Sequence, residues 1–228
     1  MSGMSSEREH PSRSRRYGLV LGLAWTVAVS ASFMWSCVRD REATSYAARV
    51  SARAQFAKDV LYRRWNAGHG GVYVPVSGSS LPNPYLTQVS EREVGTPSGR
   101  RLTLVNPAYM TRQVHELGME DEGVLGHITS LKPIRPANAP DAWESRALKT
   151  FDEGEEEFSS VEPLKGKAYL RLMRPLRTEK GCLKCHAQQG YREGDVRGGI
   201  SISVPMAPYV TLAARNRAAM GGAHGLLW

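Results

Sequence analysis

Lys167-Ala-Tyr-Leu-Arg-Leu-Met-Arg-Pro-Leu176 and Gly198-Gly-Ile-Ser-Ile-Ser-Val204 are two stretches in which apolar and polar side chains alternate. A period of two residues is that of a β-strand with one buried face. The pattern therefore predicts two strands, with Tyr169 or Leu170 facing inward in the first. The residues between them have to connect the two strands, and they carry the most specific motif of the chain.

That motif is Cys182-Leu183-Lys184-Cys185-His186. C-x-x-C-H is the spacing at which two thiols attach to the vinyl groups of one haem, and the following histidine becomes a neutral imidazole ligand of the iron. With 3 Cys and 6 His in 228 residues, such a pattern arises by accident in roughly one chain in a thousand. The motif predicts one covalently attached haem c, anchored by Cys182 and Cys185 and ligated by His186.

Two other kinds of site also use paired cysteines. A structural zinc ion needs four Cys or His ligands, and the one further thiol, Cys37, lies inside an apolar run. A redox dithiol normally sits at a strand-to-helix junction of a βαβ unit, and no such pattern precedes Lys180. Both alternatives stay open, but these residues favour haem.

The N-terminal region contains an uncharged run of 21 residues from Gly18 to Val38. It is long enough to cross the hydrocarbon core of a bilayer as a helix. Arginines precede the run, whereas the charges that follow it cancel, so the positive-inside rule predicts that residues 1–16 are cytoplasmic. Covalent haem attachment in bacteria takes place on the opposite side. We therefore expect a single-pass inner-membrane anchor with the haem domain in the periplasm.

A cleaved signal peptide is the alternative for this run, because the small residues Ala28-Val-Ser-Ala-Ser lie toward its end. The length of the run favours an uncleaved anchor. Cys37 follows Trp35 and Ser36, which make a poor lipidation site, so we expect a membrane-buried thiol. The net charge of +8 does not indicate a nucleic-acid partner, because no basic face with interleaved aromatic residues is present.

Residues 42–65 lack Gly and Pro and predict a long amphipathic helix that leaves the membrane and stops at the glycines from Gly68 onward. Its apolar stripe is expected to pair with a second copy and form a homodimer. Further strands are expected at 72–75, 102–105 and 126–131. Helices are expected at 142–151 and at 107–119, the latter with Asn106 as its cap and Pro107 at its start. Residues 152–157 are interpreted as a solvated acidic turn rather than a cation site. The members of the stripe are Tyr46, Val50, Ala54, Ala57, Leu61 and Trp65.

Beyond the first 38 residues, about 190 remain, which fits one domain with linker or signalling helices. After Pro208 the chain is expected to be helical, and its last apolar residues look like the first turns of a second membrane span. The predicted segments are 1–16, a cytoplasmic basic tail; 17–38, a transmembrane anchor; 39–66, a membrane-proximal signalling helix; 67–208, the haem domain; and 209–228, an exit helix and truncated second span.

Several longer blocks of sequence carry a resemblance to a known family. They are Tyr62-Arg-Arg-Trp-Asn-Ala-Gly-His-Gly-Gly-Val-Tyr-Val-Pro75, Asn106-Pro-Ala-Tyr-Met-Thr-Arg-Gln113, Gly126-His-Ile-Thr-Ser-Leu-Lys-Pro-Ile-Arg-Pro136, Glu179-Lys-Gly-Cys-Leu-Lys-Cys-His186 and Arg197-Gly-Gly-Ile-Ser-Ile-Ser-Val-Pro205. Over residues 53–208 the chain resembles the PAS-like periplasmic sensor domains that bind haem covalently in front of bacterial histidine kinases and chemoreceptors. The resemblance implies an α+β fold with a PAS-like mixed antiparallel sheet and flanking helices. It also implies a downstream kinase or chemoreceptor module, which this sequence does not contain.

The sixth position of the iron has several candidate ligands. His69 is favoured, because neighbouring glycines let the backbone approach a porphyrin, and because relatives in the resembled family take the distal ligand from near this helix end. His127 and Met110 follow, and an empty or water-filled position stays open. The remaining candidates are His115, Met119 and Met173.

Other residues are expected to hold the porphyrin itself. Arg112 and Arg135 are predicted partners of the haem propionates, because a guanidinium holds a carboxylate through two parallel hydrogen bonds. Exposed salt bridges are the alternative for both. The aromatic residues predicted to wall the porphyrin, or else to be ordinary core, are Trp65, Tyr73, Tyr109 and Tyr191.

Three functions fit these features. The favoured one is a membrane-anchored haem sensor, in which redox state or a small haem ligand changes the iron coordination and moves the membrane-connected helices. The second is a monohaem electron carrier with the same anchor. The third is a peroxidase with His127 or His115 as distal acid or base. No hydrolase triad, catalytic carboxylate pair or phosphate loop is visible, so we predict a protein that is not an enzyme.

Overall fold

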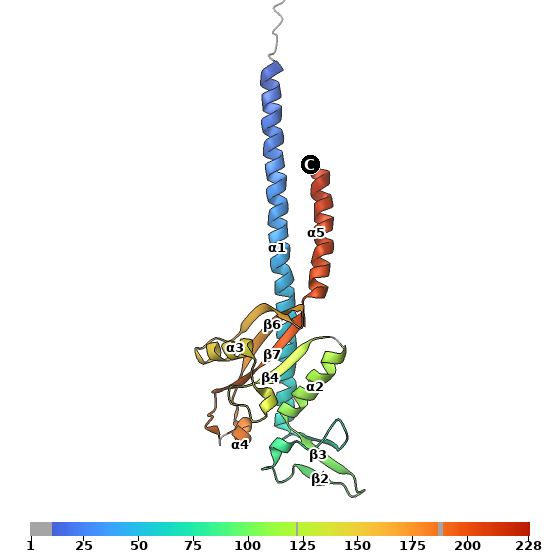
Figure 1. Cartoon of the computed structure of the whole chain (residues 1–228), viewed down its shortest axis with the longest axis vertical. Coiled ribbons are helices and arrows are strands. Elements are labelled where there is room, and N and C mark those ends of the chain that lie inside the picture. Colours follow the sequence, from blue (N-terminus) through green and yellow to red (C-terminus); the bar gives the residue numbers. More distant parts are fainter. Residues whose placement is uncertain (1–10, 122, 187–188) are drawn as a thin grey trace, which may run out of the picture. The chain divides into compact units, whose positions relative to one another are not determined.

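The computed structural model describes residues 11–121, 123–186 and 189–228. They form two compact units: Ala47–Ala207, and a second that joins the residues up to Tyr46 with Pro208–Trp228. Helix α1 (Pro11–Gly68) belongs to both units (Figure 1). The predicted membrane run and the predicted amphipathic helix are therefore one continuous helix, which ends at the predicted glycine.

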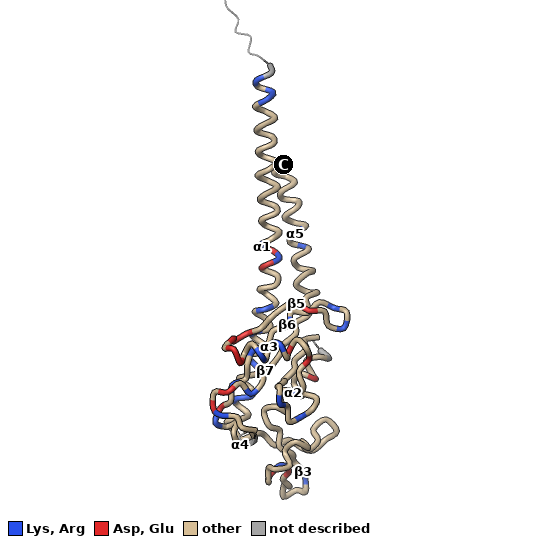
Figure 2. The backbone as a smooth tube through the Cα atoms, turned by 60° about the vertical axis from the view of Figure 1, so that its left-hand side comes forward, with Lys and Arg blue, Asp and Glu red and all other residues tan. Residues whose placement is uncertain are grey.

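The smaller unit pairs the first part of α1 with helix α5 (Ala207–Leu227). Arg217 donates to Asp40 at 2.9 Å, and Ser32 contacts the His224 ring at 3.2 Å. Among the described residues, α1 is the one helix long and apolar enough to cross a membrane. Figure 2 shows its charge-free stretch beyond the basic N-terminal turns. The cytoplasmic placement of residues 1–10 lies outside the described part.

The larger unit is built on a four-stranded antiparallel sheet of order β4-β7-β6-β5. The two strands predicted from alternation are β6 (Lys167–Arg177) and β7 (Val196–Pro205), which pair along nearly their whole length. The strand predicted after residue 125 is β4 (Leu125–Thr129) and pairs with β7. An α+β class with antiparallel strands is confirmed.

Strand β5 (Phe158–Leu164) was not predicted. It forms a hairpin with β6 through Lys165 and Gly166, which have φ angles of 49° and 77°. Positive φ at both central residues is the geometry of the two-residue turn that joins antiparallel strands. As the edge strand, β5 tolerates Pro163, a residue that argues against a strand when it is read from sequence alone.

Both faces of the sheet are covered, so β6 and β7 do not have the single buried face that alternation predicted. The odd-numbered side faces helix α3 (Ala142–Asp152), where Met173 packs with Trp143 and Phe151. The opposite side faces α1, where the Arg174 guanidinium lies 5.4 Å from the Phe56 ring centre (Figure 1). The apolar residues buried on that side include Leu170, Leu172, Ile200, Ile202 and Val204.

The stripe predicted along α1 is exposed, whereas a neighbouring face of the helix is buried. Ala48, Ala52 and Phe56 are buried within the larger unit, and Asn66 is fully buried with its amide donating to the Val105 carbonyl at 3.1 Å. The predicted stripe residues of this unit, Val50, Ala54, Ala57, Leu61 and Trp65, are all exposed.

A buried carboxylate joins α3 to the sheet. Glu144 is 2% exposed and accepts hydrogen bonds from His127 of β4 at 3.0 Å and from Ser201 of β7. Arg171 of β6 lies 3.4 Å from Glu144 and 2.8 Å from Asp141, the residue that caps α3. This cluster neutralises charges that would otherwise be costly to bury.

The same cluster makes the stability of the fold depend on pH. The hydrogen bond with Glu144 raises the pKa of His127 above its ordinary value of 6.5. Burial opposes ionisation of Glu144, but the hydrogen bonds from His127 and Ser201 outweigh it and lower the pKa of Glu144 below 4.5. The His127 contribution is complete below pH 6.5 and is lost as pH rises through its raised pKa, whereas the Glu144 contribution is lost as pH falls through its lowered pKa.

We therefore expect the contribution of the His127–Glu144 pair to the free energy of unfolding to be larger at about pH 5.5 than at about pH 8.5, whereas His186, with its lowered pKa, acts in the opposite direction. Urea titrations at the two pH values measure the difference. In a His127→Asn chain the difference should shrink, because the titrating group is gone. An unchanged difference in that variant would assign the pH dependence to other groups.

The remaining strands form a separate three-stranded antiparallel sheet, with β3 (Arg101–Val105) between β1 (Val72–Pro75) and β2 (Glu93–Gly95). The strands thus divide between two sheets. Gly71 has a φ of 106°, and a Cβ there would lie 2.5 Å from Leu104, so glycine is needed where α1 passes into β1.

Helix α2 (Pro107–Asp121) follows β3 directly. As predicted, Asn106 caps it, and its side-chain oxygen accepts from the backbone N–H of Tyr109 at 2.9 Å. Two 3-10 turns lie in other connections: η1 (Pro84–Leu86) between β1 and β2, and η2 (Pro136–Asn138) between β4 and α3. The end of α1, the start of α2 and both connections face the segment that links β6 to β7.

Candidate functional site

The cysteine motif is held where β6 and β7 separate. The Thr178 N–H donates to the Asp195 carbonyl at 2.8 Å, and the Gly194 N–H donates to the Thr178 carbonyl at 2.9 Å. These bonds close the base of the connection between the strands. Beyond them lie the 3-10 turn η3 (Lys180–Cys182) and the one-turn helix α4 (Leu183–His186). The sheet therefore presents the motif at the end of its two central strands.

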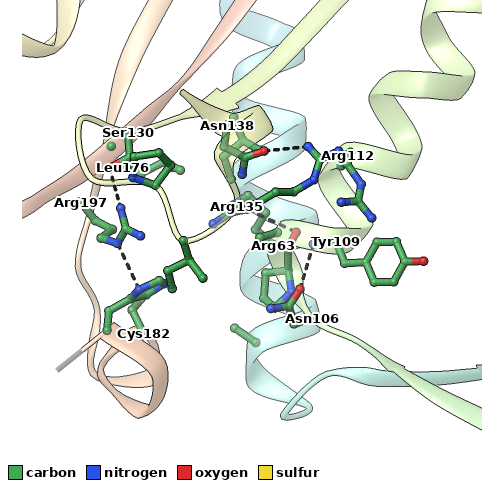
Figure 3. Close-up of a pocket in the computed structure, with 18 of the residues that line it drawn as sticks. Arg63, Asn106, Tyr109, Arg112, Ser130, Arg135, Asn138, Leu176, Cys182 and Arg197 are labelled. Atoms are coloured by element: carbon green, nitrogen blue, oxygen red, sulfur yellow. Dashed lines mark hydrogen bonds between the residues drawn. The ribbon is translucent and has the colours of Figure 1, made fainter. Parts of the chain in front are cut away.

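This motif opens onto a cavity of about 220 Å³ within the larger unit. Figure 3 shows Cys182 and Arg197 on one side of the cavity and Arg63, Arg112 and Arg135 on the other. Apolar side chains complete the wall. The residues named in the sequence analysis that line it are Cys182, His186, Tyr109, Arg112 and Arg135. Cys185 lies in α4 between two of them, and its side chain is outside the described part.

His186 has two neighbours at its Nδ1 atom. Gln189 Oε1 lies 2.9 Å away, and the Arg197 Nε–H donates to the same nitrogen at 3.1 Å. The two contacts need opposite protonation of Nδ1, so only one forms at a time. Burial lowers the pKa of His186, and the positive charges of Arg197 and Arg63 lower it further. A neutral imidazole, the form that binds a metal ion, is thus favoured.

Six arginines line the cavity, and three of them have a carboxylate partner. Arg64 pairs with Glu179 at 3.1 Å, and Arg177 pairs with Glu156 at 2.5 Å. Arg112 lies 3.7 Å from Glu116 one turn along α2, and its guanidinium stacks 4.4 Å from the Tyr109 ring centre. The carboxylates Glu179, Glu156 and Glu116 are largely exposed, so these pairs are solvated.

The other three, Arg63, Arg135 and Arg197, have no carboxylate within 4.0 Å among the residues that the structure describes. Arg135 donates to the Asn138 side chain at 3.0 Å. Arg197 donates to Ser130 at 2.6 Å and lies over the Tyr191 ring. A cavity that gathers cations without counter-ions is suited to an anionic ligand.

Arg63 and Arg197 were not singled out from sequence. Arg63 stands beside Arg64 in a helix, and both line the cavity, but only the rotation of α1 against the sheet makes the first partly buried and leaves the second exposed beside Glu179. Arg197 precedes the glycines at the start of β7, and its role depends on the partner strand across the chain. The sequence offered one signal for Arg197, because this basic residue directly precedes the strand that was predicted to follow the motif.

The predicted sixth ligand, His69, and the predicted wall residue Trp65 do not line the cavity among its described residues. Both are exposed at the end of α1. The His69 Nδ1 contacts the Trp65 carbonyl at 2.7 Å, and the two rings lie 4.5 Å apart. Their predicted contact with a haem stays a prediction.

The other candidate ligands also have partners elsewhere. His115 contacts Asp59 at 2.6 Å, and His127 contacts Glu144. Both face a neighbouring cavity of about 170 Å³, which shares Arg112 with the first. Met173 is fully buried beneath α3, Met119 is exposed, and Met110 receives a weak hydrogen bond from Asn66 at 3.8 Å. Besides His186, no histidine or methionine is among the described residues of the 220 Å³ cavity.

The donor set of the cavity fits a haem. One thiol and one imidazole of the motif share a space with apolar side chains and with guanidinium groups that lack counter-ions, and a porphyrin with two carboxylates needs all of these. The described residues contain no group of three or more Cys, His, Asp and Glu side chains able to hold a bare metal ion. Fold and cavity together define an α+β ligand-binding domain attached to an apolar N-terminal helix.

The chain belongs to the Tll0287-like family, whose sequence profile matches residues 36–205. The match includes most of the larger unit and the end of the apolar run. Among solved structures, the chain is similar to the crystal structure of the cyanobacterial haem protein Tll0287, at 18% identity and a TM-score of 0.37. That similarity covers 44% of this chain and 73% of the other. No curated protein matches the chain.

Proposed function

We propose that this chain binds one haem c covalently through Cys182 and Cys185, with His186 as an iron ligand. The observation that carries the proposal is that Cys182 and His186 of a C-x-x-C-H motif line the same cavity as three guanidinium groups without counter-ions. The family is named after a cyanobacterial haem protein, which supports this choice of cofactor. A bound haem would supply an iron that changes oxidation state and takes small ligands.

The residues of the chain then have separate tasks. Cys182 and Cys185 tether the porphyrin, and the favoured neutral form of His186 offers a nitrogen to the iron. Gln189 holds the other ring nitrogen, which fixes the orientation of the imidazole. Arg112 and Arg135 line the far wall of the cavity, which supports the proposal that they hold the propionates.

We propose that the role of this domain is sensing rather than catalysis, within a PAS-like haem domain on the periplasmic side of the inner membrane. The supporting feature is the path of α1. This helix contains the apolar run, and its last turns supply Val60, Arg63 and Ala67 to the wall of the cavity. A change at the haem would thus act directly on the helix that leads to the membrane. A kinase or chemoreceptor downstream would receive the signal.

The exposed stripe of α1 supports a homodimer as part of this function. Val50, Leu61 and Trp65 are 44%, 64% and 57% exposed, and the exposed alanines Ala54 and Ala57 lie between Val50 and Leu61. Small and apolar residues at intervals of three and four are the pattern along which two parallel helices pack. The membrane, through the apolar run, is the other proposed partner.

The iron is expected to keep a position open to exchange, because the described lining residues offer no second imidazole or thioether. The experiment is a visible spectrum of the full chain, matured in a periplasm that attaches haem, in the ferrous state before and after carbon monoxide. A spectral shift is the expected result and supports sensing of redox state or of a small ligand. The matched variant His69→Ala should give the same shift.

A low-spin spectrum that carbon monoxide does not change would indicate two firm ligands. That result would contradict a sensor of small ligands and would favour a monohaem electron carrier or a purely redox-driven sensor. A changed spin state in His69→Ala would identify His69 as the sixth ligand. Absence of covalent haem from the wild-type chain would end the proposal.

A further inference from the structure

Arg63 is a partly buried cation in the wall of the cavity. It lies on the last turns of α1, and its Nη1 donates to the Pro107 carbonyl and to the Thr111 hydroxyl, both at 3.2 Å. Burial lowers the pKa of Arg63 to about 10, although the charges of Cys182 and Asp59 oppose the shift. The side chain nevertheless stays protonated near neutral pH, and no carboxylate in the described part of the chain lies within 4.0 Å of its positive charge.

The geometry around Arg63 leaves part of its guanidinium free. Its two hydrogen bonds, to groups at the start of α2, both use the same nitrogen. A guanidinium has five N–H donors in a planar fork, so the remaining edge has donors for a bidentate ligand. The two hydrogen bonds to α2 hold the guanidinium in place, so the side chain loses less conformational entropy when a ligand binds.

Counting charges also points to an anion at this place. Within the described ranges, three cavity arginines lack a carboxylate partner, whereas one haem brings two propionates. Arg197 is bound to His186 and Ser130 on the motif side, and Arg135 is held by Asn138 in the loop. Both hydrogen bonds of Arg63 go to neutral acceptors, and burial already disfavours its charge, so Arg63 has the greatest need of an anionic partner.

We infer that Arg63 is the anchor of an anion site that takes a carboxylate or a similar small oxyanion inside the cavity. Two sources offer this chemistry: a propionate of the haem, or a free anion bound beside the haem as the sensed ligand. The inference deepens the proposed function and rests on it for the identity of the first source. The site itself needs only the protein, so it can be measured without haem.

The test is calorimetric titration of acetate into the full chain in detergent, in two forms. One form carries haem, and the other carries Cys182→Ser and Cys185→Ser. The haem-free form is expected to bind acetate, and Arg63→Gln in that background should weaken binding about ten-fold or more, because a charge-assisted bidentate contact is lost. Lys58→Gln is the control, since Lys58 is an exposed cation of α1 outside the cavity.

The two sources give different results. If a propionate occupies the site, acetate binds the haem-free form and not the haem form, and Arg63→Gln lowers the haem content. If the ligand is a free anion, both forms bind acetate and both lose it with Arg63→Gln. Equal acetate binding by wild-type and Arg63→Gln, or no binding by either form, would overturn the anion site.

A second variant covers a failure of Arg63→Gln to fold, which circular dichroism reveals. Arg63→Lys keeps the charge but lacks the planar fork, so acetate affinity should fall several-fold and remain measurable. Unchanged affinity in a folded Arg63→Lys chain would also count against the site. Haem staining of the wild-type chain is recorded separately. If the wild-type chain shows no haem band, the haem proposal is wrong, and the acetate titrations alone decide whether the anion site exists.

Discussion

Replacing Cys182 and Cys185 together with serine is expected to abolish covalent haem attachment. Serine has nearly the volume of cysteine, but its hydroxyl does not form the thioether that tethers the vinyl group of a haem. The expected result is loss of the haem-stained band on a denaturing gel, together with loss of the c-type absorbance of the pyridine haemochrome. The fold should persist, because Cys182 is only partly buried and lies in a short turn outside the sheet.

The third cysteine offers a matched control. Cys37 lies in α1, in the apolar run, and takes no part in the cavity. A Cys37→Ser chain should retain the full haem band. A band that survived the double substitution at 182 and 185 would show attachment elsewhere, and loss of haem in Cys37→Ser would show that the effect was not specific to the motif.

The largest expected loss of stability is that of Glu144→Ala. The carboxylate is almost completely buried and interacts with His127, Ser201 and Arg171. Removing it leaves Arg171, itself 5% exposed, with Asp141 as its remaining carboxylate partner. It also leaves the Ser201 hydroxyl without its acceptor and His127 with the Ala137 carbonyl alone. Breaking a buried ionic cluster from one side costs about 3–5 kcal/mol. Urea unfolding followed by circular dichroism measures the change.

An exposed carboxylate serves as the comparison for this loss. Glu156 pairs with Arg177 at 2.5 Å, but its side chain is 62% exposed. Glu156→Ala should cost less than about 1 kcal/mol, because water solvates both charges once the pair is broken. Glu144→Gln, which keeps the shape and part of the hydrogen bonding, should fall between the two. Equal losses for Glu144→Ala and Glu156→Ala would mean that the buried cluster contributes no special stability.

The predictions that the structure confirms depend on local sequence. β6 and β7 were recognised by alternation, α2 by its Asn106 cap and Pro107, and the end of α1 by its glycines. Each signal lies within the element it defines, so no distant contact is needed to read it. The missed strand β5 is of another kind. Its sequence, which shows no regular alternation and contains Pro163, is held extended by pairing with β6, and the pairing is visible only in three dimensions.

The residues that line the cavity also divide into those that were named from the sequence and those that were not. The motif residues Cys182 and His186, and the far-wall residues Tyr109, Arg112 and Arg135, were all named from sequence and share one space. His69 and Trp65 were named too, but the rotation of α1 leaves them exposed and turns Arg63 inward instead. The spacing of apolar residues predicts that a segment is helical. It does not predict which side of the helix packs against the sheet when two sides carry apolar residues.

By itself, the sequence determined the apolar N-terminal run, the antiparallel α+β elements and the spacing of the cysteine motif, since each depends on residues a few positions apart. The tertiary structure alone decided which charges have partners. Arg63, Arg135 and Arg197 are far apart in the chain, and each resembles any other arginine until folding sets its distance from the nearest carboxylate. Coulomb energy depends on that distance and on burial, and neither is a property of local sequence.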